Sequence, residues 1–132
     1  MKKRIFCLVL IALLLCTAIT ALAARTVGPG VTVTLASGTK TSNSAAPTVT
    51  VGTFYTESGE AYVFWVTNST RGKQVTPTYY FNSAGSKDVY YMRESINAGD
   101  VPTGDRYAAL ARSSANTLPD EVGEITLSRF VP

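Results

Sequence analysis

Hydrophobic and polar side chains alternate in short runs along the chain after residue 24, and turn-forming residues separate one run from the next. A two-residue period places every second side chain on the same face of an extended backbone, so each run predicts a β-strand. Valine, threonine and tyrosine dominate the runs, and these residue types favour strands. The predicted strands span residues 31–35, 48–55, 61–67, 75–81, 89–93, 107–112 and 125–131.

Three of these runs also indicate their place in a sheet. Residues 61–67 are apolar on both faces, which is typical of a central strand. The turn-forming segment 57–60 separates residues 48–55 from residues 61–67, so we expect these two strands to pair as a hairpin. Pro77 lies inside the run at 75–81 and has no N–H group to donate, which predicts an edge strand or a bulge.

The spacing of the strands leaves no room for the helices that connect parallel strands. The predicted fold class is therefore all-β, an antiparallel β-sandwich of about seven strands that is immunoglobulin-like in size. The pattern does not fix the order of the strands. Residues 105–115 have an alternative, because their four alanines are compatible with a helical turn, although their apolar positions form only a weak helical stripe.

The N-terminal segment 1–23 has the three parts of a bacterial-type secretory signal peptide. Residues 2–4 are basic, residues 5–19 form an uncharged apolar run, and Ala21 and Ala23 place small side chains at a cleavage site. We expect cleavage before Ala24 and export of the remaining chain as one domain, to the outside of the cell or to the periplasm. An uncleaved membrane anchor is the alternative, because about 20 apolar residues can cross a bilayer.

Removal of the signal changes the composition of the chain. Residues 24–132 remain, which is an ordinary length for one domain. Three of the 12 basic residues are lost, so nine basic and nine acidic residues balance. This argues against nucleic acid as a partner, which requires a basic surface. Cys7 and Cys16 are also lost, so no disulfide is expected; a lipid anchor on Cys16 is a weaker alternative, since Leu15 before it is large.

The missing residue types narrow the chemistry further. The chain has no histidine, and no cysteine remains after cleavage. The usual general base, the thiolate nucleophile and the common zinc, copper and haem ligands are therefore absent. We expect a protein that is not an enzyme and that carries no cofactor or metal.

Acidic residues offer the remaining candidates for catalysis or metal binding. A hydrolase that uses two carboxylates would need one of three groups, although turn formation also explains acids in such segments. A weak calcium candidate consists of Asn97, Asp100 and Asp105, which flank a glycine-rich loop but lack the spacing of a known calcium loop. The three acidic groups are Glu57 with Glu60, Asp100 with Asp105, and Asp120 and Glu121 with Glu124.

Aromatic side chains are concentrated in and beside the predicted strands. If the Trp65 side of its strand faces solvent, Tyr79 or Tyr90 from neighbouring strands would extend it into a flat surface of the kind that stacks on sugar rings. The alternative places Trp65 in the core, where large aromatic side chains contribute most to stability. Trp65, Tyr79 and Tyr90 are therefore the predicted ligand-binding residues.

These observations predict a secreted or cell-surface β-sandwich module that binds a glycan or a protein surface and catalyses no reaction. A small secreted effector that acts through a loop, such as an antibacterial protein or an enzyme inhibitor, is an alternative. A hydrolase that uses two carboxylates is the less favoured alternative. Contact with a membrane is expected only if the signal peptide is retained as an anchor.

Overall fold

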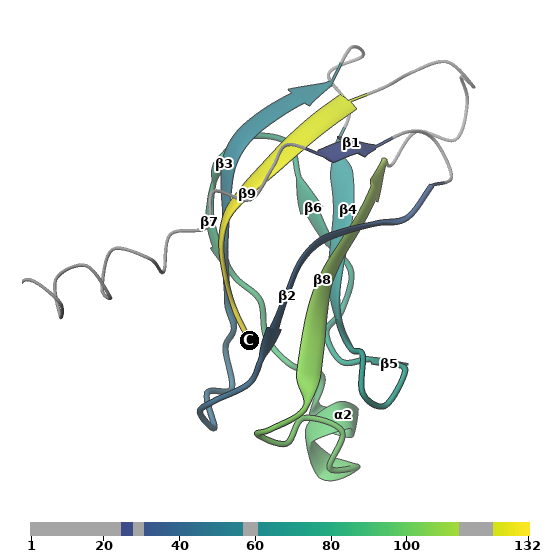
Figure 1. Cartoon of the computed structure of the whole chain (residues 1–132), viewed down its shortest axis with the longest axis vertical. Coiled ribbons are helices and arrows are strands. Elements are labelled where there is room, and N and C mark those ends of the chain that lie inside the picture. The colour runs from purple at the N-terminus through teal and green to yellow at the C-terminus, as the bar shows by residue number, and fades with distance from the viewer. Residues whose placement is uncertain (1–24, 28–30, 57–60, 114–122) are drawn as a thin grey trace, which may run out of the picture.

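Two β-sheets face each other in the folded domain, with very little helix (Figure 1). The computed structural model describes residues 25–27, 31–56, 61–113 and 123–132. The predicted signal peptide and its cleavage site before Ala24 lie outside these residues. Within them, no helix is both long enough and apolar enough to cross a membrane.

Every pair of described strands is antiparallel, which confirms the predicted all-β sandwich. The first sheet has the order β1 (Arg25–Val27), β9 (Gly123–Val131), β3 (Thr48–Thr56) and β7 (Gly85–Asp88). The second sheet has the order β2 (Val33–Thr39), β8 (Arg106–Ser113) and β4 (Tyr62–Asn68), with β5 (Lys73–Gln74) and β6 (Tyr79–Phe81) sharing the far side of β4.

The core lies between the two sheets and is filled by side chains that point inward from both. In β4, Phe64 and Val66 have no exposed surface, and the Phe64 ring meets the Phe81 ring edge to face, with centroids 5.7 Å apart. Val49 from β3 and Leu127 from β9 complete the core from the first sheet. Each such side chain contributes about 1.5–3 kcal/mol through burial.

The position of β4 confirms one prediction and corrects another. β4 has β8 on one side and β5 and β6 on the other, so it is an inner strand, as its apolar faces predict. The predicted hairpin between residues 48–55 and 61–67 is wrong, because β3 belongs to the first sheet and pairs with β7 and β9. Turn residues at 57–60 are compatible with a hairpin and with a crossing between sheets, and the long-range pairing of β3 with β9 decides between them.

The run at 75–81 lies at a sheet edge, as Pro77 predicts. The edge strand is divided into β5 and β6, and residues 75–78 between them include the proline. Val75 still donates its N–H to the Val66 carbonyl oxygen at 2.9 Å. The Val66 N–H is accepted by the Thr76 hydroxyl at 2.9 Å, so a buried side chain replaces the backbone acceptor where the ladder is broken.

The predicted strand at 89–93 is wrong. Residues 89–92 belong to no sheet, and helix α2 (Arg93–Asn97) follows them after Met92, whose backbone is extended. Their backbone groups bond elsewhere: the Val89 N–H donates to the Pro47 carbonyl oxygen and the Met92 N–H to the Val75 carbonyl oxygen. The alternation itself is real, because Val89 and Tyr91 are buried. The alternative helix at 105–115 is wrong, because β8 occupies most of that segment.

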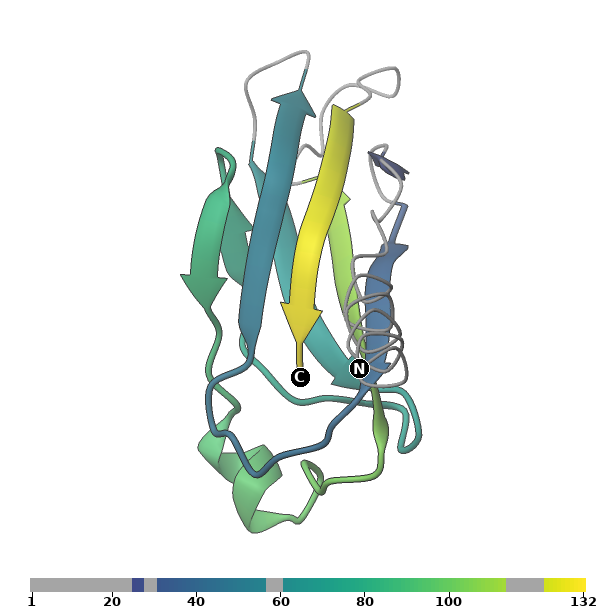
Figure 2. The ribbon, with the colours of Figure 1, turned by 60° about the vertical axis from the view of Figure 1, so that its left-hand side comes forward.

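Three connections gather beside α2 at one end of the sandwich, which we call the loop end (Figure 2). They are the β2–β3 connection at 40–47, residues 89–92, and the connection at 98–105 between α2 and β8. The Lys40 N–H donates to the Asp105 carbonyl oxygen at 3.1 Å, and the Gly104 N–H donates to the Lys40 carbonyl oxygen at 2.9 Å. These bonds fix the first connection against the third.

Candidate ligand-binding pocket

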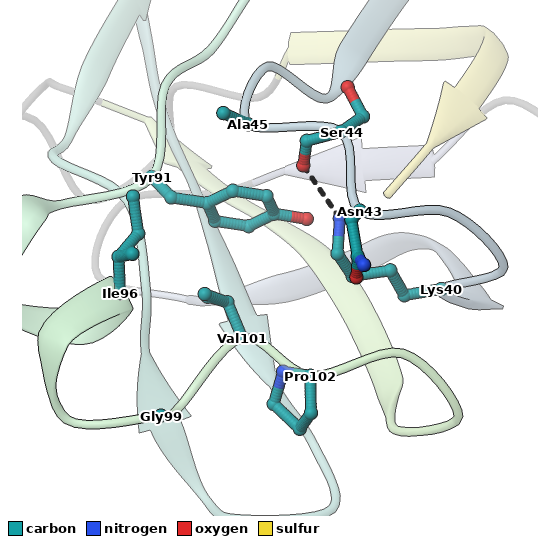
Figure 3. Close-up of a pocket in the computed structure, with 9 residues that line it drawn as sticks. All are labelled: Lys40, Asn43, Ser44, Ala45, Tyr91, Ile96, Gly99, Val101 and Pro102. Atoms are coloured by element: carbon teal, nitrogen blue, oxygen red, sulfur yellow. Dashed lines mark hydrogen bonds between the residues drawn. The ribbon is translucent and has the colours of Figure 1, made fainter.

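A pocket of about 310 Å³ opens at the loop end, between two segments that are far apart in the sequence. One segment begins at Lys40, directly after β2, and continues to Ala45. The other runs from Tyr91 through α2 to Pro102 (Figure 3). The volume lies at the lower end of the range for small-molecule sites, which are usually concave, mostly apolar and equipped with a few polar groups.

Lys40 supplies the cationic group of the pocket. Its side chain is only 2% exposed, and its Nζ donates to the Ser44 carbonyl oxygen at 2.7 Å. The same Nζ lies 4.8 Å from the centroid of the Tyr91 ring, a cation–π distance. Among the described residues no carboxylate lies within ion-pair distance of Lys40. Burial lowers the pKa of the Lys40 ammonium, because removal from water penalises its charged form.

Tyr91 supplies a hydroxyl group without a partner. The hydroxyl oxygen is buried and, among the described residues, is the one side-chain polar atom so placed that makes no hydrogen bond. Figure 3 shows the ring extending across the pocket with its hydroxyl toward the end of Lys40. Burial raises the pKa of the Tyr91 phenol, so the group is a neutral donor at physiological pH.

The remaining wall of the pocket is largely apolar. Ile96 projects from α2 and is 46% exposed, while Val101 is half-buried and packs against the core. Pro102 and Ala45 complete this wall from the two opposite segments. The pocket therefore combines an apolar wall with a buried cationic donor and a buried neutral donor, and the exposed polar residues Asn43 and Ser44 lie at its margin.

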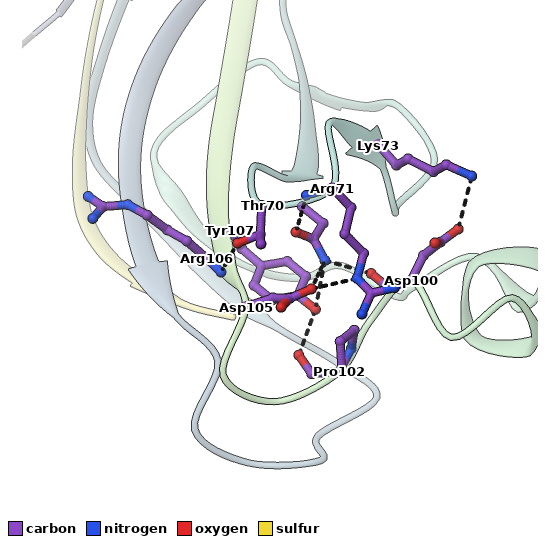
Figure 4. A network of polar contacts seen from close by, with 9 residues as sticks. Thr70, Arg71, Lys73, Asp100, Pro102, Asp105, Arg106 and Tyr107 are labelled. Atoms are coloured by element: carbon purple, nitrogen blue, oxygen red, sulfur yellow. Dashed lines mark hydrogen bonds and ion pairs between the residues drawn. The ribbon is translucent and has the colours of Figure 1, made fainter.

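A polar network under the pocket fixes residues 100–105 (Figure 4). Asn68 is fully buried, and its Nδ2 donates to the Asp100 carbonyl oxygen and to Asp105 Oδ2, both at 2.8 Å. The Arg71 Nε donates to Asp105 Oδ2 at 2.6 Å. The hydrogen bond from Asn68 and the Arg71 guanidinium lower the pKa of the Asp105 carboxyl. The Tyr107 hydroxyl donates to the Pro102 carbonyl oxygen at 2.9 Å, which ties the network to the pocket wall.

The same network accounts for the predicted calcium residues. Asp105 faces Arg71, and Asp100 Oδ2 lies 3.7 Å from the Lys73 Nζ, while Asn97 is exposed at the end of α2. A calcium ion would have to displace these cations. In the described part of the chain, no three histidine, cysteine, aspartate or glutamate side chains are grouped so that they could hold a metal ion.

The acidic groups predicted for a hydrolase are only partly described. Asp100 and Asp105 are held by Lys73 and Arg71, respectively. The other candidates lie outside the described side chains, namely Glu57, Glu60, Asp120, Glu121 and Glu124.

The predicted aromatic surface is divided between two faces. Trp65 lies between the core residues Phe64 and Val66 and is half-buried. Because side chains alternate along a strand, it points outward from the second sheet. Tyr79 is the register partner of Phe64 and therefore shares the inward face. Trp65 and Tyr79 thus do not form one surface, and a binding role for Trp65 stays a prediction.

Tyr90 and Tyr80 are the exposed aromatic neighbours of these residues. Tyr90 follows β7 outside any strand and is 60% exposed, and its N–H donates to the Tyr79 hydroxyl at 3.0 Å. Tyr80 is the register partner of Val63 and is 63% exposed, so it shares the outward face with Trp65. The register partner of Trp65 is Leu110 in β8, so Tyr80 is the exposed aromatic side chain that shares this face, and it is not one of the predicted ligand-binding residues.

Lys40 and Tyr91 were missed because the sequence marks neither of them. Lys40 follows a strand and precedes a polar loop, where a lysine is ordinarily exposed. Tyr91 fits the alternation of its run and looks like any core residue. Their proximity depends on how residues 40–45 and 91–102 meet at the loop end. Comparison of the chain with known protein families, with curated proteins and with solved structures found no match.

Proposed function

We propose that the chain is an exported, non-enzymatic binding module and that the pocket at the loop end is its binding site. One observation carries the proposal: a buried ammonium group and a buried hydroxyl group without a partner meet beside an apolar wall. Its partner would be a small molecule, or an end group of a protein or glycan, that fits a pocket of about 310 Å³.

The cost of burying polar groups supports this proposal. A buried donor without a partner costs about 1–3 kcal/mol, so such groups are rare in folded proteins and call for an explanation. Elsewhere in the domain, buried polar side chains such as Asn68 and Thr76 make hydrogen bonds. A ligand that accepts a hydrogen bond from Tyr91 would offset the cost at this site.

The composition of the chain supports binding without catalysis. The chain has no histidine, and both cysteines lie in the predicted signal peptide. Asp100 and Asp105, the acidic pair near the pocket, are held by cations, which leaves them poorly suited to proton transfer. Lys40 and Tyr91 recognise a ligand in this proposal and take no part in a reaction.

A screen of small ligands against the exported protein tests the proposal. Saturation-transfer NMR with a library of small acids, amides, sugars and dipeptides should detect binders. Ala45→Trp places a large side chain at the pocket wall and should abolish their binding. Ser42→Trp is the matched control, because Ser42 is exposed in the same loop but does not line the pocket. Binders that Ala45→Trp does not affect, or a library without binders, would refute the proposal.

A further inference from the structure

The charge balance of the pocket indicates what kind of ligand it takes. From it we infer that the pocket recognises a carboxylate attached to an apolar body; this rests on the proposed function. Among the described residues the Lys40 ammonium has no anionic partner, and the one hydrogen bond of its Nζ goes to the neutral Ser44 carbonyl oxygen. A hydrogen bond between an ammonium and a carboxylate is about twice as strong as one between neutral groups. A carboxylate is therefore the acceptor that forms the strongest hydrogen bond with the Lys40 ammonium.

The two donors match the two oxygens of one carboxylate. An ammonium group has three N–H donors, and Lys40 uses one of them on Ser44. The Tyr91 hydroxyl lies on the same side of the pocket and has its proton to donate. One carboxylate oxygen accepts from Lys40, and the other accepts from Tyr91. The apolar body then lies against Ile96 and Val101.

Other ligand classes fit these residues less well. A cation is repelled by Lys40. A phosphate group is best bound by arginine or by several strong donors. Among the described residues no arginine lines the pocket, the Ser44 hydroxyl already donates to the Ala46 carbonyl oxygen, and Asn43 adds one exposed neutral amide. A neutral sugar needs several polar partners for its hydroxyl groups, but the wall is formed largely by apolar side chains.

The ligand reaches both donors from the side of residues 41–45. The side chains of these residues are exposed, and Ser44 provides the carbonyl oxygen that now accepts from Lys40. The incoming carboxylate accepts from the N–H groups of Lys40 that the bond to Ser44 leaves free.

Hexanoate and hexanamide form a matched pair of probes, because they differ only in the charged end. Isothermal titration of the exported protein should give hexanoate an affinity at least about tenfold higher, a difference of about 1.4 kcal/mol. N-acetyl-leucine extends the test to a peptide carboxyl terminus. Tighter binding of N-acetyl-leucine than of hexanoate would assign the carboxylate to a protein partner, and the reverse order to a free acid.

The probes also separate this inference from the proposed function. Equal affinity for hexanoate and hexanamide would overturn carboxylate recognition but leave a working pocket. Failure of every compound in the library and of both probes would overturn the proposed function itself. Tighter binding of glucuronate than of hexanoate would overturn the inference that the body of the ligand is apolar.

Two substitutions assign the recognition to the two donors. Tyr91→Phe removes a hydroxyl that makes no hydrogen bond with the described residues, so the variant should fold and bind hexanoate about tenfold more weakly. Tyr80→Phe is the matched control, because Tyr80 is exposed on the other side of the second sheet. Lys40→Met should abolish the preference for hexanoate over hexanamide. Unchanged hexanoate affinity in Tyr91→Phe would contradict the inference.

Discussion

Tyr91 and Lys40 are polar side chains whose burial is energetically costly. Both are removed from water, and burial shifts the pKa of each toward its neutral form, upward for the phenol and downward for the ammonium. Within the part of the chain that the structure describes, neither has a charged partner of the kind that offsets burial for Asp105, which faces Arg71. The contrast between these neighbouring groups is the physical basis for placing a ligand at the loop end.

The buried phenols predict how stability depends on alkaline pH. Burial raises the pKa of Tyr107 to about 12 and raises that of Tyr91 as well, while unfolded tyrosine titrates near about 10. Above about pH 10 the unfolded chain loses phenolic protons that the folded chain keeps, so the free energy of unfolding should fall from about pH 10 to 12. The Tyr107 contribution to this loss is about 2 kcal/mol.

Urea denaturation at about pH 9 and about pH 11.5 measures this loss. The lowered pKa of Lys40 makes the free energy of unfolding rise with pH, which is the opposite direction. This rise ends at about pH 10.4, where the lysine of the unfolded chain loses its proton. Tyr91→Phe should show a smaller loss than the original protein. A free energy of unfolding that does not change over this range would mean that the phenols are solvated.

Trp65 provides a second prediction for a single residue. It is half-buried on the outward face of the second sheet. Replacement by alanine should therefore lower the free energy of unfolding by about 2 kcal/mol, which lies between the usual effects at surface and core positions. The affinity of Trp65→Ala for hexanoate should equal that of the original protein. A folded variant that no longer binds would place the site on the outward face of the second sheet, and an unfolded variant would place Trp65 in the core.

At the scale of elements, the local sequence predicts where strands form and where they are interrupted better than it predicts which strands pair with each other. The position of Pro77 correctly indicates an edge, because a missing N–H group has the same consequence in any sheet. The hairpin between residues 48–55 and 61–67 fails, because β3 takes as its partner β9, which lies at the far end of the chain. The pocket could not be predicted for the same reason, since neither the loop at 40–45 nor the segment at 91–102 with its short helix indicates that it lies beside the other.

The break in the edge strand gives a prediction about Thr76. Thr76→Val keeps the shape of the side chain but leaves the buried Val66 N–H without an acceptor. The loss of that acceptor should cost about 1–3 kcal/mol. Thr78→Val is the matched control, because Thr78 is exposed at the same edge. Its stability should stay close to that of the original protein, as is usual for surface substitutions. Urea denaturation measures both; equal effects of the two substitutions would show that the Thr76 hydroxyl is not needed in the ladder.

At the scale of the whole molecule, the chain forms one sandwich that relies on its core. Composition and alternation are sufficient to predict this class, because the predicted mature domain has strand-forming residues throughout and no cysteine for a disulfide. They could not predict the position of the pocket. That depends on where loops meet at one end of the sandwich, and the sequence alone places no loop beside another.

The predicted export concerns the whole molecule, and the intact mass of the protein tests it. The intact mass of the protein recovered from medium or periplasm should correspond to residues 24–132 after cleavage before Ala24. A full-length mass confined to the membrane fraction would identify segment 1–23 as an anchor.

The location of bound hexanoate tests the central claim most directly. Amide chemical shifts of the ¹⁵N-labelled exported protein should be followed during a hexanoate titration. We expect the largest changes at Lys40, Ser44 and Tyr91 and along residues 96–102, with little change at Trp65 and Tyr80. Changes centred on the outward face around Trp65, or no saturable change anywhere, would contradict a binding site at the loop end.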